Sequence, residues 1–176
     1  QVHSSLWIEA QNSDNLSADA HFTSRKNKAL LIRTADCMPI LMRNGDRIAA
    51  VHAGWRGLIH NILLNSTPPF LTRECQVCVG PHIQLSSFEV GQEVADEIKA
   101  FGETLGLVKK DIMLPHQDSK KIWVSLASLA RAQIESSGAQ LMMMSTQDTL
   151  TSSDYFSYRR NSRETGRQIS FVVRHC

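Results

Sequence analysis

The chain has 176 residues, of which 42% are hydrophobic and 20% are charged, and its formal net charge is +2. This length and composition are typical of a globular protein with its own core, and so small a net charge gives no electrostatic argument for binding nucleic acid or a membrane surface. The sequence has no apolar run of roughly 20 residues and no signal-peptide pattern at its start. We therefore expect a cytoplasmic protein, with no membrane segment, whose four cysteines are free thiols or metal ligands.

The first part of the chain predicts strands joined by polar loops. Apolar runs at residues 6–8 and 29–33 are typical of strands, and residues 11–20 are rich in Asn, Asp and Ser, as in a loop. A short helix is expected over 58–65, because Pro68 and the proline after it would stop it.

The rest of the chain alternates helices, loops and strands. Apolar residues at helical spacing predict helices over 89–101 and 124–137. The polar segments 109–121 and 145–153 are expected to be loops. The predicted strands are 76–81, a buried methionine-rich run at 141–144, and 169–173. The pattern as a whole predicts a mixed α+β fold.

A hairpin is predicted in the first third of the chain. Asn44-Gly45 lies between two apolar runs and favours a two-residue type I′ turn. If the two residues that flank this dipeptide face each other, Cys37 faces His52, with Cβ atoms roughly 4.5–5.5 Å apart. That separation suits two metal ligands, or a nucleophile and its base, but also a buried thiol beside a hydrogen-bonded histidine. Pro39 cannot donate to the ladder, so a bulge or an edge strand is also expected.

The histidines and cysteines give one candidate metal site. His3, Cys37 and His52 would leave an open fourth position, as catalytic zinc sites do, although on spacing alone a histidine near a terminus is more often simply solvated. Cys75 and Cys78 form a single C-x-x-C motif. A zinc ribbon needs two such motifs, and the strand-like surroundings argue against a redox function.

Two arginine sites could hold an anion. Arg159 and Arg160 follow an aromatic segment, and Arg56 lies between two glycines beside Trp55. A guanidinium group matches the geometry of phosphate oxygens, but the same arginines could instead pack on the neighbouring aromatic rings.

Five sequence blocks occur together in a fixed order. They are Gln1-Val2-His3, Thr34-Ala35-Asp36-Cys37-Met38-Pro39-Ile40, Val51-His52-Ala53-Gly54-Trp55-Arg56-Gly57, Val79-Gly80-Pro81 with Glu89-Val90-Gly91, and Phe156-Ser157-Tyr158-Arg159-Arg160 with Thr165-Gly166-Arg167. In combination they resemble the YfiH-like family, whose members are also called laccase-domain proteins, polyphenol oxidases, peptidoglycan editing factors and purine nucleoside phosphorylases.

The resemblance implies a fold and a metal site. The fold is an α+β structure, a mixed α/β/β/α sandwich in a single domain over residues 1–176, from which an upstream segment of the family is missing. The implied metal ligands are His3, Cys37 and His52, and the implied metal is Zn²⁺, with copper as the alternative.

The resemblance also implies a function. Members of the YfiH-like family are described as zinc-dependent phosphorylases of adenosine, inosine and methylthioadenosine with adenosine deaminase activity. The expected partners are therefore a purine nucleoside and phosphate. The alternatives are editing of peptidoglycan precursors, copper-dependent phenol oxidation, and a metal-binding homologue that has lost catalysis. Multicopper oxidation needs more histidine ligands than one three-residue cluster provides.

The remaining blocks supply candidates for the other roles. The candidates for holding phosphate are Arg56, Arg159 and Arg160. Trp55 or Phe156 would stack on the purine, and Asp36 would orient a ligand or carry a proton. The chain departs from the family at Ser87, Phe88, Ser125 and Ser145. These departures affect the expected shape of the pocket and leave the three metal ligands in place.

Overall fold

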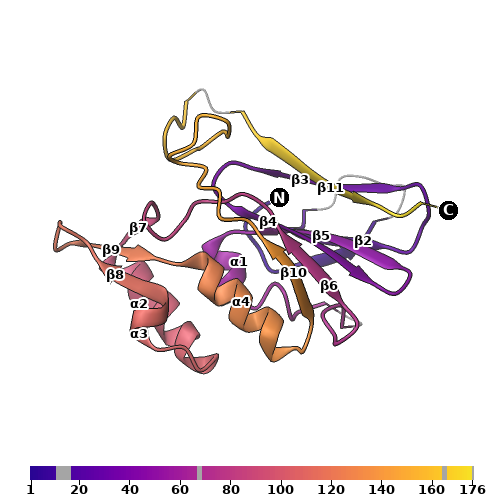
Figure 1. Cartoon of the computed structure of the whole chain (residues 1–176), viewed down its shortest axis with the longest axis horizontal. Helices are drawn as coiled ribbons and strands as arrows, with labels where there is room; N and C mark the ends of the chain where they lie inside the picture. The colour runs from indigo at the N-terminus through magenta and orange to yellow at the C-terminus, as the bar shows by residue number, and fades with distance from the viewer. Residues whose placement is uncertain (11–16, 67–68, 164–165, 176) are drawn as a thin grey trace.

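A six-stranded sheet forms the centre of the computed structural model, which describes residues 1–10, 17–66, 69–163 and 166–175. In spatial order its strands are β1 (Trp7–Glu9), β2 (Ala20–Thr23), β5 (Arg47–Ala53), β4 (Met38–Asn44), β6 (Gln76–Val79) and β10 (Gln140–Met144). The outer pairs β1–β2 and β6–β10 are parallel, and the inner pairs are antiparallel (Figure 1).

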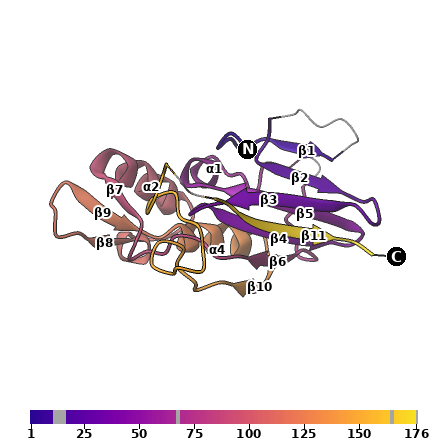
Figure 2. The ribbon, with the colours of Figure 1, turned by 90° about the horizontal axis from the view of Figure 1, so that it is seen from above.

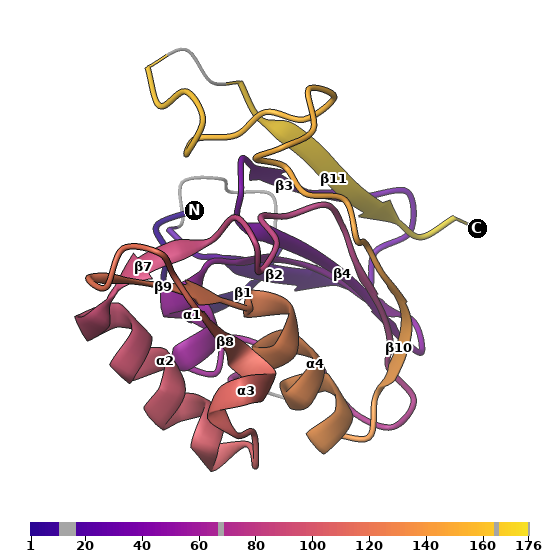
Figure 3. The same cartoon turned by 60° about the vertical axis from the view of Figure 1, so that its left-hand side comes forward.

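The two faces of this sheet are covered by different layers. An antiparallel ribbon of β3 (Ala29–Thr34) and β11 (Gln168–Val173) lies over one face, and the helices lie against the other (Figures 1 and 3). Alternation along the strands explains both contacts, because successive side chains point to opposite faces. The helix side carries Met38, Ile40, Met42, Ala49, Val51 and Ala53. The ribbon side carries Leu41, Ile48 and Ala50, packed on Leu30 and Ile32.

Four helices and a small sheet complete the described chain. The helices are α1 (Trp55–Ile59), α2 (Gln92–Thr104), α3 (Lys109–Ile112) and α4 (Leu126–Ser136). The small sheet contains β7 (Glu89–Gly91), β9 (Lys121–Val124) and β8 (Met113–Pro115), and lies at the opposite end of the molecule from the C-terminus (Figure 2). Within the described residues, no helix combines the length and apolarity needed to cross a bilayer.

The mixed α+β fold expected from the sequence is confirmed. Of the four layers of an α/β/β/α sandwich, the described residues form three: the helices, the six-stranded sheet and the ribbon. The strands expected over 29–33, 76–81 and 169–173 are present, and the helix expected over 124–137 is α4. The hydroxyl of Ser125 caps that helix by accepting a hydrogen bond from the N–H of Ser128.

The register predicted for the hairpin is wrong by two residues. Asn44 pairs with Arg47, so the turn residues are Gly45 and Asp46, and Gly45 has φ +58°, as the first position of a type II′ turn requires. Asn44 is drawn into the strand because its buried amide donates to the carbonyl of Phe70 at 2.7 Å and the hydroxyl of Thr72 at 3.0 Å.

The two-residue difference in register leaves Cys37 and His52 on the same face of the hairpin, as predicted. Met38 pairs with Ala53, so Cys37 lies diagonally from His52 rather than directly opposite it. A shift of one residue would turn a side chain to the other face, whereas a shift of two does not. Cys37 and His52 therefore share the ribbon side of the sheet.

The bulge or edge position expected at Pro39 is also wrong. β4 lies between β5 and β6, and its pairing with β5 continues through Pro39 and His52 without a register shift. Pro39 lacks an N–H group at the point where the pairing of β4 with β6 ends. There Gly80 donates its N–H to the Pro39 carbonyl at 2.9 Å, and its own carbonyl accepts a hydrogen bond from the Nδ1 of His82 at 2.9 Å.

Several predicted elements have different limits. The helix expected over 58–65 begins at Trp55 and ends at Ile59, and the one expected over 89–101 begins only at Gln92, after a strand. The loop expected over 109–121 contains α3 and β8 and reaches the start of β9, and β2 was not predicted. The part of the predicted loop over residues 11–16, and Pro68, lie outside the described residues.

The methionine-rich strand is at the surface, not in the core. Met142 is 57% exposed and Met143 is 54% exposed. β10 is the edge strand of the sheet, and its pairing with β6 shifts register between Leu141 and Met143. An edge strand with a bulge has fewer neighbours to cover its side chains.

Candidate functional site

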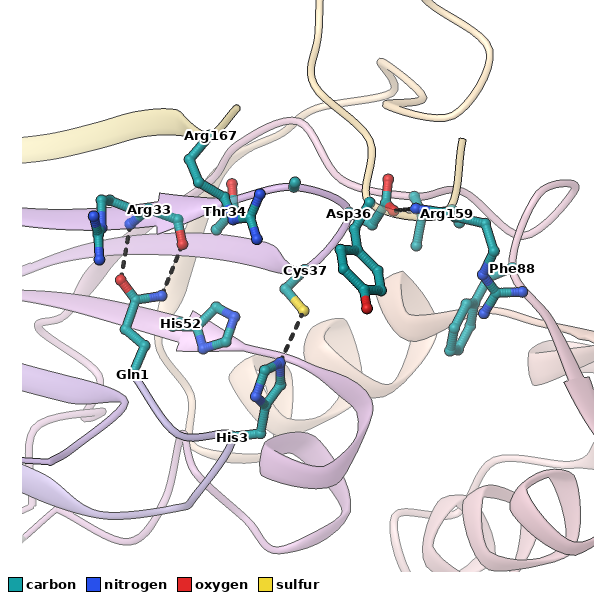
Figure 4. A pocket seen from close by; sticks show the side chains of 13 residues that line it. Gln1, His3, Arg33, Thr34, Asp36, Cys37, His52, Phe88, Arg159 and Arg167 are labelled. Atoms are coloured by element: carbon teal, nitrogen blue, oxygen red, sulfur yellow. Dashed lines mark hydrogen bonds between the residues drawn. The ribbon is translucent and has the colours of Figure 1, made fainter. Parts of the chain in front are cut away.

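Three potential metal ligands converge at the open end of the hairpin. The Nε2 atom of His3 lies 3.8 Å from the Sγ atom of Cys37, and the rings of His3 and His52 meet edge to face, with centroids 4.9 Å apart (Figure 4). One ligand atom from each of the three residues lies within 4.8 Å of the others. The three residues that the sequence groups as one candidate metal site thus lie together.

The donor set fits a metal ion. Two ligands bonded at about 2.0–2.3 Å to a tetrahedral ion lie roughly 3.5 Å apart, so the three side chains need to close by little more than ~1 Å. Two nitrogens and a sulfur are ligands that zinc and copper both accept. Among the described residues, this is the one group of three or more His, Cys, Asp or Glu side chains with such a geometry.

The backbone around the ligands permits this close approach. Cys37 directly precedes β4, His52 is a buried residue of β5, and His3 belongs to the N-terminal segment. Gly54 lies between them: a Cβ atom there would stand 3.2 Å from the ring of His3 and 3.3 Å from the Sγ atom of Cys37. A side chain at this position would have to push the ligands apart.

Asp19 holds two of the three ligands in place. Its carboxylate bonds the Nδ1 of His52 at 2.7 Å and accepts hydrogen bonds from the backbone N–H groups of Val2, His3 and Ser4. The Nε2 atom of His52 is therefore the one turned toward the other ligands, as in a carboxylate–histidine–metal arrangement. Asp19 was not among the predicted site residues, because it lies beside His52 only through the pairing of β5 with β2, the strand that was not predicted.

The surroundings shift the pKa values of the site in the absence of a metal. Burial alone would raise the pKa of Asp19, but its hydrogen bonds with His52, Ser4 and Val2 outweigh burial and hold it well below the usual range. Burial lowers the pKa of His52, so this ring is neutral near pH 7. Burial and the negative charges of Asp36 and Asp19 raise the pKa of Cys37 to about 12. A metal that binds here would therefore displace the thiol proton.

Acid should destabilise the metal-free protein. The pKa of His52 is lowered from 6.5, so below that pH the unfolded chain binds more protons and folding stability falls with pH. We expect up to about 1.4 kcal/mol of lost stability per pH unit from His52 between pH 6.5 and 5. Urea denaturation in a chelator across this range would measure the loss. A His52→Gln variant should have the shallower slope, and a slope equal to that of the native protein would contradict the assignment.

A cavity of about 820 Å³ opens beside the three ligands. Its wall combines three arginines with apolar side chains (Figure 4). The lining residues are Gln1, His3, Arg33, Thr34, Ala35, Asp36, Cys37, His52, Ile83, Phe88, Tyr158, Arg159 and Arg167. A cavity of this size with a few cationic groups suits a small anionic or phosphate-dependent substrate.

Asp36 organises the loop that covers one end of this cavity. Its carboxylate accepts hydrogen bonds from the hydroxyl of Thr149 at 2.8 Å and the backbone N–H of Arg159 at 2.7 Å. Arg159 in turn donates to the backbone carbonyl of Glu89 at 2.9 Å and lies over the ring of Phe88. Asp36 thus positions Arg159.

Four other predicted residues do not line the cavity. Arg56 lies over its neighbour Trp55, with 4.5 Å between the guanidinium carbon and the ring centroid. Arg160 donates to the four carbonyls of Thr149, Leu150, Ser152 and Tyr155, and so closes its own loop. Phe156 packs against Gly166, where a Cβ atom would come within 2.7 Å of the ring.

The cavity residues Arg33 and Arg167 were not among the predicted site residues. Both lie in or beside the blocks that carry the family resemblance, which is the signal that could have found them. Of the four departures from the family pattern, only Phe88 lines the cavity. Ser87 donates to Asp148, Ser125 caps α4, and Ser145 accepts from the N–H of Gln147. Cys75 and Cys78 are free cysteines outside the cavity lining.

Comparison with known proteins supports the family resemblance. Residues 1–175 match the family model described as multi-copper polyphenol oxidoreductase laccase. The chain belongs to this laccase-domain, YfiH-like family. A purine nucleoside phosphorylase of Pseudomonas aeruginosa is 35% identical over 98% of this chain and 71% of its own length. Purine nucleoside phosphorylase YfiH of Escherichia coli is 32% identical over the same shares of the two chains.

Solved structures of YfiH-like proteins share this fold. A crystal structure of a Neisseria meningitidis protein of the family DUF152 has a TM-score of 0.86 and 30% identity, and covers 99% of this chain and 73% of that one. The YfiH structure of Bacillus licheniformis, at 22% identity, has a TM-score of 0.84 over 99% of this chain and 72% of that one, which concerns the fold alone.

Proposed function

We propose that this YfiH-like protein is a zinc-dependent purine nucleoside phosphorylase of adenosine, inosine and methylthioadenosine, with adenosine deaminase activity. The observation that carries the proposal is a three-ligand cluster at the wall of an arginine-lined cavity. Relatives that share about a third of its residues are named purine nucleoside phosphorylases.

His3, Cys37 and His52 would hold the metal. A zinc ion at such a site acts as a Lewis acid and lowers the pKa of bound water toward ~7. Zinc fits this proposal better than copper, because multicopper oxidation uses a separate electron-relay site. The described residues offer one ligand cluster only.

The residues of the cavity supply binding and orientation. Phe88 and Tyr158 present aromatic surface to a purine, and a guanidinium group on the wall would bind phosphate oxygens. Asp36 fixes Arg159 through the backbone, so its role here is to position that residue. Holding nucleoside and phosphate together beside the ligand cluster removes much of the entropic cost of their encounter.

The test is an assay of the purified protein with adenosine, inosine and methylthioadenosine, with and without phosphate. We expect free base and sugar 1-phosphate only when phosphate is present, and inosine from adenosine without it. Metal analysis should find zinc. A protein that is silent on all three nucleosides but oxidises phenols with copper, or acts on peptidoglycan precursors, would overturn the proposal.

A further inference from the structure

Two of the three arginines that line the cavity, Arg159 and Arg167, have different surroundings. Arg159 already donates to the carbonyl of Glu89, and its guanidinium nitrogen lies 4.0 Å from the carboxylate of the same residue. A hydrogen bond from Lys121 keeps the pKa of Glu89 below its usual range, so this carboxylate stays ionised. The guanidinium group of Arg159 is therefore held at the Glu89–Phe88 end of the cavity, away from the ligand cluster (Figure 4).

Arg167 lies on the opposite wall, close to the metal ligands. It directly precedes β11, whose first residue, Gln168, pairs with Thr34 of β3. Its positive charge acts on Cys37, where it partly offsets the rise in the pKa of the thiol. Its side chain also donates to the carbonyl of Gly166 at 2.8 Å. An anion held by Arg167 would thus lie beside the ligand cluster (Figure 4).

Thr34 is a second polar residue on the wall of the cavity that carries Arg167. It faces inward between the ribbon and the six-stranded sheet and is only 2% exposed. Its hydroxyl is buried and has no hydrogen-bond partner among the described residues, although the residue lines the cavity. A buried hydroxyl without a partner costs free energy, and native proteins usually satisfy such groups with a ligand or water when the protein itself does not.

We propose that Arg167 and Thr34 form the subsite that binds the phosphate co-substrate, and that the Arg159–Phe88 end of the cavity is left to the nucleoside. This inference rests on the proposed phosphorolysis and assigns its two substrates to opposite walls. It replaces the expectation that Arg56, Arg159 or Arg160 binds phosphate.

The experiment is steady-state phosphorolysis with varied phosphate and varied inosine. Removal of a charge-assisted hydrogen bond in Arg167→Gln should raise the KM for phosphate by about 10- to 100-fold and leave the KM for inosine and the metal content unchanged. The KM for phosphate of Arg167→Lys should lie between that of the native protein and that of Arg167→Gln. Arg159→Gln should raise the KM for inosine instead. Arg163→Gln, in the same loop but outside the cavity lining, is the matched control and should behave as the native protein does.

Thr34→Val separates binding from structure. The change removes only a hydroxyl that has no protein partner, so the thermal stability without phosphate should not fall, while the KM for phosphate should rise. In a second measurement without nucleoside, inorganic phosphate should raise the melting temperature of the native protein and of Arg163→Gln, but not of Arg167→Gln.

These readouts distinguish the two proposals. If nucleosides are phosphorolysed but Arg167→Gln keeps the native KM for phosphate, the subsite is wrong and the function stands. If no nucleoside is cleaved but phosphate stabilises the protein through Arg167, the function is wrong and the subsite stands.

Discussion

Replacing Cys37 with alanine is expected to release the metal ion and to reduce kcat/KM for inosine phosphorolysis by about 1,000-fold or more, because a metal ion contributes several kcal/mol to transition-state stabilisation. The thiolate would be the one anionic ligand in a set with two neutral histidines. Without it, only two neutral imidazole nitrogens remain to hold the ion. Metal analysis of the purified variant and a kinetic assay would measure the two effects.

The chain offers a matched control for this substitution. Cys78 is also a free, partly exposed cysteine, but it lies on β6 outside the cavity lining. Cys78→Ala should keep both metal and activity. Far-ultraviolet circular dichroism should be the same for both variants, which excludes unfolding as the cause. A Cys37→Ala protein that retains one metal ion per chain and native kinetics would rule out Cys37 as a ligand.

Replacing Asp19 with asparagine is the second change with a large expected effect. Among the described residues, its two oxygens accept hydrogen bonds from three backbone N–H groups, the hydroxyl of Ser4 and the ring of His52. An amide would turn its own NH₂ group toward some of them, at a cost of about 1–3 kcal/mol for each donor left without a partner. Metal affinity should fall about 10- to 100-fold, as when the carboxylate partner of a ligating histidine is removed.

Competition with a zinc chelator and urea denaturation would measure the two losses. Asp96→Asn is a suitable control, because Asp96 lies on α2, where its carboxylate accepts an exposed hydrogen bond from the side chain of Gln92. A native chelator titration for Asp19→Asn would show that His52 needs no carboxylate to hold its orientation.

The sequence was sufficient to predict that Cys37 and His52 share one face of the hairpin, but not the register of the hairpin. Side chains alternate along a strand, so Cys37 and His52 share a face in any register that differs by an even number of residues. The turn lies one residue later than predicted, because the side chain of Asn44 donates hydrogen bonds to Phe70 and Thr72, which are distant in sequence. No local pattern contains that contact.

The remaining parts of the site depended on tertiary contacts. Asp19 reaches His52 only through the pairing of β2 with β5. Arg160 has the same local sequence context as Arg159, but its guanidinium group is taken up by carbonyls of its own loop, which a sequence pattern cannot reveal. The family resemblance supplied His3, since spacing alone gave no reason to place a residue of the N-terminal segment beside the hairpin.

The three ligands differ in how far apart they stand along the chain, and this difference has a consequence for folding. Cys37 and His52 lie on one hairpin of local contacts, whereas His3 is held by Asp19, next to β2. Because local contacts cost less loop-closure entropy, we expect the hairpin to form before His3 docks. The hairpin can therefore present two ligands before the third is in place. A metal ion that is present during folding would be captured in two stages, first by the hairpin and then by the N-terminal segment.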